Sequence, residues 1–352
     1  PGGRSAASAP LNDEPHRPAG PSLQSIPPDD VAAHGGFGTG SRARLLPGRS
    51  TQWLLSPLLP PLARLRVAWG LLRKAQLEPG ATLQEAATAR FGPVFARDLL
   101  PALGAGLFAA PPNLLAGTLL PALVGRAAGT LVRPKEGMGA FVRALAQGLP
   151  VRLNHPIRRL EIQPGGGLRG VGEEAVVLAK KVVLALPAPA AARLLAPLAP
   201  EATEGLRAIR FLDLRFRHSR HRVCPELAEG WGLLCDPGRE QGLLGFTCLP
   251  GPRNTLQLRC GMGGAYAIGP SLLAGGGLEK RLQTWFPGLA PALEHRESVA
   301  EQALPLPEPG HGARVEGILG SLPAGISWVG AGRFPGGILG ILGGLEPWAA
   351  AF

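Results

Sequence analysis

The stretch ISWVGAGRFPGGILG, residues 326–340, is the part of the sequence that decides the fold. Ile326 to Val329 are typical of a short buried strand, and glycines follow at positions 330, 332, 336 and 337 before an apolar run that can open a helix near Ile338. A strand that enters a glycine-rich turn before a helix presents free backbone N–H groups and the positive end of a helix dipole. This arrangement suits a pyrophosphate or the electron-rich edge of a flavin, although it also occurs as a plain tight turn.

Upstream of this stretch, residues 137–195 indicate layers of helices and strands. GMGAFVRAL begins a helix led by Gly137, and an apolar alternation at Val151, Leu153 and Ile157 predicts a strand. A PGGG turn, two further strands at 176–178 and 182–186, and an alanine-rich helix follow. This order is typical of α/β layering.

Residues 51–132 read as helical. Leu62, Leu65 and Trp69 follow the spacing of one helix face, and Thr82 with Glu85 forms a capping box. The 26 residues from 99 to 124 carry no charge, but four prolines divide them, so they predict an apolar cavity wall or a membrane-resting face rather than a spanning helix.

The remaining segments complete an α/β (α+β) fold class. Short apolar runs broken by glycine between 210 and 300 predict an antiparallel sheet, and the first residues indicate a linker. The predicted segments are a disordered lead-in at 1–45, a helical subdomain at 46–132, a sheet-domain segment at 133–210, the antiparallel sheet at 211–300 and a closing sheet-domain segment at 301–352.

Composition limits the classes of partner and metal site. The chain has 352 residues and a formal charge of +11, but only five of its 36 basic residues are lysine and no basic stripe alternates with aromatic residues. We therefore expect no nucleic acid, and favour an anionic lipid or polycarboxylate. Four dispersed cysteines predict reduced thiols. We read His218, His221 and Cys224 as a solvated strand face or loop, and predict no metal site.

Seven motifs in order resemble the protoporphyrinogen oxidase family of the flavin-containing amine-oxidase superfamily. From about Gly40 onward they are RLLP at 44–47, WLLSPLL at 53–59, ARFGPVFARDLLPALGAGLFAAPPNLL at 89–115, GMGAFVRAL with VRLNHPIRRL at 137–160, VVLALPAPAAARLL at 182–195, ALPLPEPGHGARV at 303–315 and VGAGRFPGGILG at 329–340.

The resemblance implies an FAD-binding sheet domain of the amine-oxidase type, a helical substrate or membrane subdomain, and FAD-dependent oxidation of protoporphyrinogen or coproporphyrinogen in heme biosynthesis. It implies FAD contacts from Ile157, Gly330, Gly332, Gly336, Gly337, Ile338 and Leu339. Phe108 and Phe246 are candidate substrate contacts, and no catalytic residue is assigned. The implied location is cytoplasmic, at the inner face of the cell membrane, with a homodimer left open.

The resemblance also implies that the first FAD-binding segment lies outside this chain. HGGFGTG at 34–40 approaches the dinucleotide fingerprint, but Ser41 stands where its third glycine would be. We therefore expect weak FAD binding. Two alternatives stay open: another amine-oxidase-type flavoprotein, such as a carotenoid desaturase-like enzyme, and an inactive fragment that binds a hydrophobic ligand or membrane.

Overall fold

The computed structural model describes residues 23–25, 35–39, 42–45, 58–73, 78, 80–125, 132–134, 137–173, 175–227, 232–274, 276–335, 340–341 and 343–345. The chain divides into two compact units, one formed by Pro1–Pro27 with Thr130–Leu153 and the other by Pro28–Gly129 with Asn154–Phe352.

The smaller unit contains a two-stranded antiparallel sheet of β1 (Leu23–Ser25) and β4 (Val132–Pro134), followed by helix α8 (Met138–Ala146). The glycine-led helix is thus present where the sequence predicts it. The strand predicted from Val151 is not, because strand β5 begins only at Ile157. Asn154 has a left-handed φ of 59° and Pro156 follows it, which ends the extended alternation that the apolar pattern suggested.

The larger unit contains a group of short helices: α3 (Pro61–Leu72), α4 (Leu83–Phe91), α5 (Pro93–Asp98), α6 (Leu100–Phe108), the 3₁₀ helix η1 (Gly117–Leu119) and α7 (Leu120–Gly125). Thr82 and Glu85 form the predicted capping box on α4. Prolines stand in the first turns of α6 and α7 and in the segment between them, so the uncharged run is divided into short helices. Within the described residues, no helix has the length and apolar character needed to cross a bilayer.

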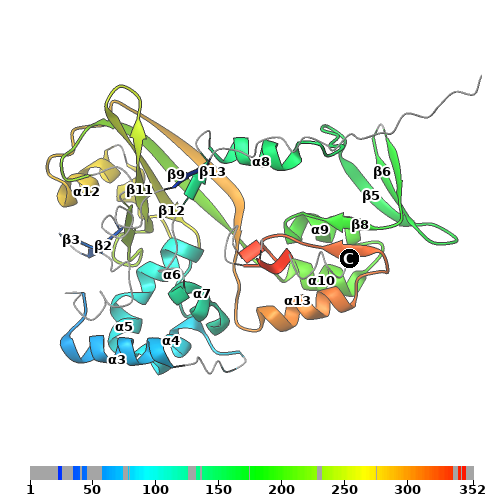
Figure 1. Ribbon diagram of the computed structural model, residues 1–352, viewed down its shortest axis with the longest axis horizontal. Helices are drawn as coiled ribbons and strands as arrows, with labels where there is room; N and C mark the ends of the chain where they lie inside the picture. The colour runs from blue at the N-terminus through cyan, green and yellow to red at the C-terminus, as the bar shows by residue number, and fades with distance from the viewer. Residues whose placement is uncertain are drawn as a thin grey trace, which may run out of the picture. The chain divides into compact units, whose positions relative to one another are not determined.

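A seven-stranded sheet has the order β13-β9-β12-β11-β10-β2-β3 and is antiparallel except between β10 and β2 (Figure 1). Its strands are β2 (Gly35–Thr39), β3 (Arg42–Leu45), β9 (Phe211–Arg222), β10 (Gly232–Cys235), β11 (Leu243–Gly251), β12 (Thr255–Gly263) and β13 (Glu294–Pro305). The antiparallel sheet is confirmed. Strands β2 and β3 lie in the segment that is predicted from the sequence to be a linker. This segment has no strand-like apolar pattern, and β2 forms by pairing with β10.

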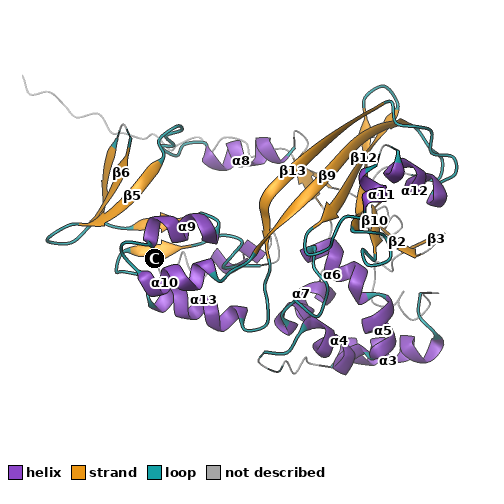
Figure 2. Cartoon of the chain, turned by 180° about the vertical axis from the view of Figure 1, so that it is seen from behind, coloured by secondary structure: helices purple, strands orange, loops and turns teal. Residues whose placement is uncertain are grey.

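The two faces of this sheet belong to different hydrophobic cores. One face packs against helices α11 (Pro270–Leu273) and α12 (Gly277–Trp285), as Figure 2 shows, and its core includes Cys235, Cys248 and Cys260. The other face contributes Leu212 and Leu214 to the core of the short helices. All four cysteines are buried, and none of them forms a disulfide in the structure.

A third core surrounds a parallel pair of strands, β8 (Val182–Leu184) and β14 (Ile326–Trp328). Around it lie the antiparallel sheet β5-β6-β7 and three helices: β5 (Ile157–Ile162), β6 (Leu168–Gly172), β7 (Val176–Ala179), α9 (Ala188–Leu195), α10 (Pro200–Arg207) and α13 (His311–Gly320). Segments far apart in the sequence thus share one core, which positions the end of β14.

The turn between β5 and β6 contains a spacing that sequence reasoning overlooked. Gly165, Gly167 and Gly170 match the G-x-G-x-x-G pattern. In the structure this stretch joins two antiparallel strands, and Gly165 and Gly167 have φ near +90°. A dinucleotide loop must lead from a strand into a helix. The match is therefore a hairpin turn and not a cofactor loop.

Candidate functional site

The glycine turn after β14 is the candidate cofactor site. The N–H groups of Arg333 and Phe334 each donate to the carbonyl of Gly330 at 3.0 Å, which closes the turn. β14 is parallel to β8, and in open α/β sheets ligands bind just beyond the carboxyl ends of parallel strands. The turn is therefore at the end of the sheet where a cofactor is expected.

Packing explains both glycines that the structure describes in this turn. Gly330 has a φ of +123°, a value that residues with a Cβ rarely adopt. A Cβ on Gly332 would lie 2.9 Å from the ring of Trp328, which is fully buried and donates its Nε1–H to the carbonyl of Leu186 at 3.0 Å. The two glycines thus allow the left-handed backbone at Gly330 and the close approach of the backbone to a buried tryptophan at Gly332.

A buried histidine lies beside the turn. His311, at the start of α13, is 5% exposed, and within the described residues neither ring nitrogen has a well-formed hydrogen bond. Burial lowers the pKa of His311, and the nearby backbone of Gly332 opposes this shift only in part. The ring is therefore neutral near pH 7, with one donor and one acceptor. A buried polar group without a partner is costly, so this ring fits a site whose ligand completes its bonding.

The other residues predicted to contact FAD are only partly placed. Ile157 is half-buried at the start of β5 and packs against the same core as Ile326 and Trp328. The strand and the turn thus share one core, while the contact of Ile157 with FAD stays a prediction. Gly336, Gly337, Ile338 and Leu339 lie outside the described residues.

The two candidate substrate contacts lie in separate cores. Phe108 ends α6 and is buried among the short helices. Phe246 is buried on β11 and meets Phe286 edge to face at 5.7 Å. The structure does not bring the two rings together, and their role as substrate contacts stays a prediction.

The histidine and cysteine cluster at the end of β9 is not a solvated face. His221 is buried, with its ring nitrogens 2.9 Å from the Ser219 hydroxyl and the Ala290 carbonyl. Cys224 is buried and donates to the Glu226 carboxylate at 2.7 Å. The sequence interpretation as a solvated face or loop is wrong because alternate residues of β9 face the core under α12. Among the described residues, no group of three or more His, Cys, Asp or Glu side chains could hold a metal ion.

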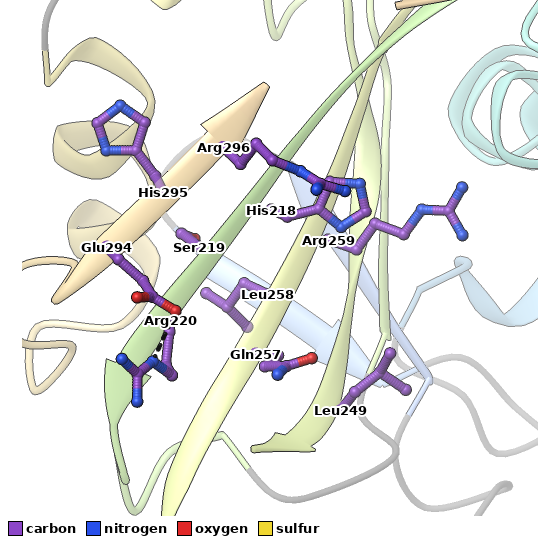
Figure 3. Close-up of a pocket in the computed structure, with 10 residues that line it drawn as sticks. All are labelled: His218, Ser219, Arg220, Leu249, Gln257, Leu258, Arg259, Glu294, His295 and Arg296. Carbon is purple, nitrogen blue, oxygen red and sulfur yellow. Dashed lines mark hydrogen bonds and ion pairs between the residues drawn. The ribbon is translucent and has the colours of Figure 1, made fainter. Parts of the chain in front are cut away.

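A cavity of about 550 Å³ on the seven-stranded sheet was missed by sequence reasoning. Figure 3 shows its lining, in which His218, Arg259 and Arg296 come from three neighbouring strands. The basic residues of β9 were visible in the sequence. Their neighbours on β12 and β13 depend on strand register, which no single-sequence pattern specifies.

Comparisons with known proteins bear on the family and the fold. The model of the family "Flavin containing amine oxidoreductase" matches residues 51–214. No curated protein sequence matches the chain.

Solved structures share the fold at low sequence identity. A protein from Exiguobacterium sp. 255-15 named "putative protoporphyrinogen oxidase" has a TM-score of 0.69 at 14% identity, over 94% of this chain and 81% of that one. Cyclohexylamine oxidase from Brevibacterium oxydans IH-35A has a TM-score of 0.68 at 15% identity, over 94% and 82%. Reduced UDP-galactopyranose mutase has a TM-score of 0.62 at 14% identity, over 90% and 74%. The expected fold class is confirmed, because the chain shares its fold with these solved structures. The family whose model matches residues 51–214 is flavin-containing, in agreement with the flavin cofactor that the sequence predicts.

Proposed function

We propose that this chain takes part in the FAD-dependent oxidation of a porphyrinogen to the porphyrin. The observation that carries the proposal is the end of the parallel pair β8 and β14, where the turn of Gly330 and Gly332 lies beside the buried, unpartnered ring of His311. Bound FAD would supply the hydride acceptor. The protein supplies orientation and exclusion of water.

Each residue of the turn has a role that follows from its surroundings. Gly330 would let the backbone approach the flavin without a Cβ, and Gly332 lets the same turn pack closely on Trp328. The neutral ring of His311 would complete its bonding with a polar atom of the cofactor, and the low pKa of His311 keeps the ring uncharged there. Trp328 fixes the strand end through its bond to Leu186. None of these groups is a strong acid or base, which suits hydride transfer to a cofactor.

The porphyrinogen substrate rests on the ordered sequence motifs and on the fold. The solved relatives include a protein named for that activity and an enzyme named for cyclohexylamine, so amine oxidation is the alternative to test. A desaturase-like activity and an inactive fragment remain further alternatives.

Contact with a membrane is part of the proposal. On α3 an apolar stripe is exposed, with relative exposures from 59% for Trp69 to 83% for Leu72, and Leu62 and Leu65 lie between these values. The opposite side of α3 buries Val67 and Gly70. Such a stripe fits a peripheral position on the inner face of a membrane.

The test is an oxidase assay on residues 1–352 with excess FAD. Protoporphyrinogen, coproporphyrinogen and cyclohexylamine are supplied in separate reactions, and porphyrin fluorescence and H₂O₂ are measured against a reaction without protein, which corrects for spontaneous oxidation. We expect porphyrin formation from one porphyrinogen, and a slower rate in His311→Leu. FAD binding without porphyrin formation would refute the substrate, and H₂O₂ from cyclohexylamine alone would favour the amine.

A further inference from the structure

Three side chains that can carry positive charge stand directly opposite one another on neighbouring strands. Arg296 on β13 and Arg259 on β12 both pair in register with His218 on β9. Side chains opposite one another in antiparallel strands project from the same face, about 5 Å apart at Cβ. Figure 3 shows the three side chains following one another across the sheet. We call Arg296, His218 and Arg259 the cationic row.

The opposite face of the same strands neutralises its arginines. Arg217, next to His218 on β9, is 6% exposed in its side chain and pairs with Glu279 at 3.2 Å and with Glu297. Arg215 pairs with Glu297 at 3.5 Å. On the face that packs against α12, both Arg215 and Arg217 therefore form ion pairs with carboxylates.

The cationic row has no such partners within the described residues. No carboxylate there forms an ion pair with Arg259 or Arg296, and the guanidinium of Arg259 lies 4.3 Å from the ring centre of Phe216. Further along the same face, Arg220 is neutralised by Glu294 at 2.9 Å. Arg220 therefore adds no net charge to the lining of the cavity, whereas Arg259 and Arg296 do.

This arrangement costs stability in the unliganded protein. Arg259 and Arg296 carry like charges on one face of the sheet, and like charges repel. Burial lowers the pKa of His218, and the charges of Arg259 and Arg296 lower it further, so the ring between them is neutral near pH 7. An anion in the cavity would be attracted by both guanidiniums, and the neutral ring of His218 can donate one hydrogen bond to it. Arginine guanidiniums hold carboxylates and phosphates through paired hydrogen bonds.

We propose that the cationic row is a binding site for a small molecule that carries at least two carboxylate or phosphate groups. The Cα atoms of Arg259 and Arg296 are two strand spacings apart, or about 10 Å, so one anionic group can meet each guanidinium. The side chains of Gln257 and Leu249 complete the lining.

The site is separate from the glycine turn. A Cβ on Gly332 would lie 3.5 Å from the ring of Phe211, so the first residue of β9 is next to the turn. His218 is seven residues further along the strand, or about 23 Å away at roughly 3.3 Å per residue. The inference therefore does not depend on the proposed function.

The test is isothermal titration of the protein at low ionic strength with citrate, and separately with inorganic phosphate. The variants are Arg259→Gln, Arg296→Gln and the double substitution. The control is Arg207→Gln, which removes an equal charge from the exposed last turn of α10. We expect citrate binding by the parent and control, a loss of about tenfold or more in each single variant, and no measurable binding in the double variant.

A second readout separates binding from folding. Without ligand, the thermal midpoint of the double variant should rise, because the repulsion is removed, while citrate should raise the midpoint only in the parent and the control. Unchanged citrate binding in the double variant would overturn the proposal, as would a double variant that loses both binding and stability. Stronger binding of phosphate than of citrate identifies a phosphate ligand. Binding of vesicles with anionic lipid, without binding of citrate or phosphate, would refute a small-molecule site.

Discussion

Arg217 is the residue on which the charge network under α12 depends. Its guanidinium meets two carboxylates while its side chain is almost fully buried. Arg217→Met should destabilise the protein by about 3 kcal/mol, at the low end for a broken buried pair, because Glu279 and Glu297 keep partial access to water. Urea unfolding at pH 7 measures the loss. The control Arg158→Met breaks the exposed pair with Glu173 and should cost less than about 1 kcal/mol. Equal losses in the two variants would contradict this reading.

The ion pair between Arg217 and Glu297 also makes the stability of the folded protein depend on pH. The hydrogen bond from Arg217 lowers the pKa of Glu297 below its usual 4.5. The folded state then binds fewer protons than the unfolded state, so the contribution is present above pH 4.5 and is lost as the pH falls through the folded pKa. A urea series from pH 7 to pH 3 should therefore show a shallower acid loss in Arg217→Met than in the parent protein.

At the scale of single residues, the sequence identifies the glycines of the turn but not the side chains that surround them. Gly330 and Gly332 were singled out from spacing alone, and the structure supplies the causes in a positive φ and a neighbouring tryptophan. The sequence assigns no role to His311, because burial and missing hydrogen-bond partners cannot be seen in a sequence. The cationic row was missed since its members are up to 78 positions apart and meet only through register.

At the scale of elements, the contact between α6 and β12 depends on Gly264. Its φ is +70°, and a Cβ there would overlap the carbonyl oxygen of Ala109, the residue that caps α6. Gly264→Ala should therefore cost about 1–3 kcal/mol of overpacking beyond the cost of a positive φ. Urea unfolding midpoints provide the measurement.

Gly276→Ala is the matched control for this contact. Gly276 has a similar φ of +76°, but no atom lies within 4 Å of a Cβ placed there. The difference between the two variants isolates the steric overlap from the backbone strain. Equal losses of unfolding free energy in the two variants would show that the close contact between Ala109 and Gly264 does not contribute to stability.

Elements with strong local signals were predictable, and elements made by long-range pairing were not. The capping box of α4, the glycine-led α8 and the PGGG turn after β5 each lie where the sequence predicts them. Strand β2 forms from HGGFGTG, a glycine-rich segment that gains its structure by pairing with β10. The opposite error occurs at Val151, where the alternation of apolar residues predicts a strand. The left-handed backbone of Asn154 prevents it, and β5 begins only at Ile157.

At the scale of the whole molecule, the described chain supplies one end of a dinucleotide site more clearly than the other. The flavin end has the turn of Gly330 and Gly332 and the ring of His311. For a pyrophosphate, the fold needs a strand, a glycine loop and a helix in sequence. Within the described residues, the G-x-G-x-x-G match lies in the β5–β6 hairpin, and HGGFGTG contributes β2. The proposed contacts are therefore unevenly distributed along FAD.

Residues 1–352 should consequently bind FAD reversibly and only slightly more tightly than riboflavin, which lacks the pyrophosphate and adenine. Charge-assisted hydrogen bonds to phosphate contribute roughly 1.5–3 kcal/mol each, so their absence removes most of the usual advantage of the dinucleotide. We expect dissociation constants within about tenfold, a difference of about 1.4 kcal/mol. Flavin fluorescence titration measures both ligands, and His311→Leu should weaken both equally because the ring acts at the shared flavin end. FAD that survives dialysis, or that binds hundreds of times more tightly than riboflavin, would show that this chain holds a pyrophosphate site of its own.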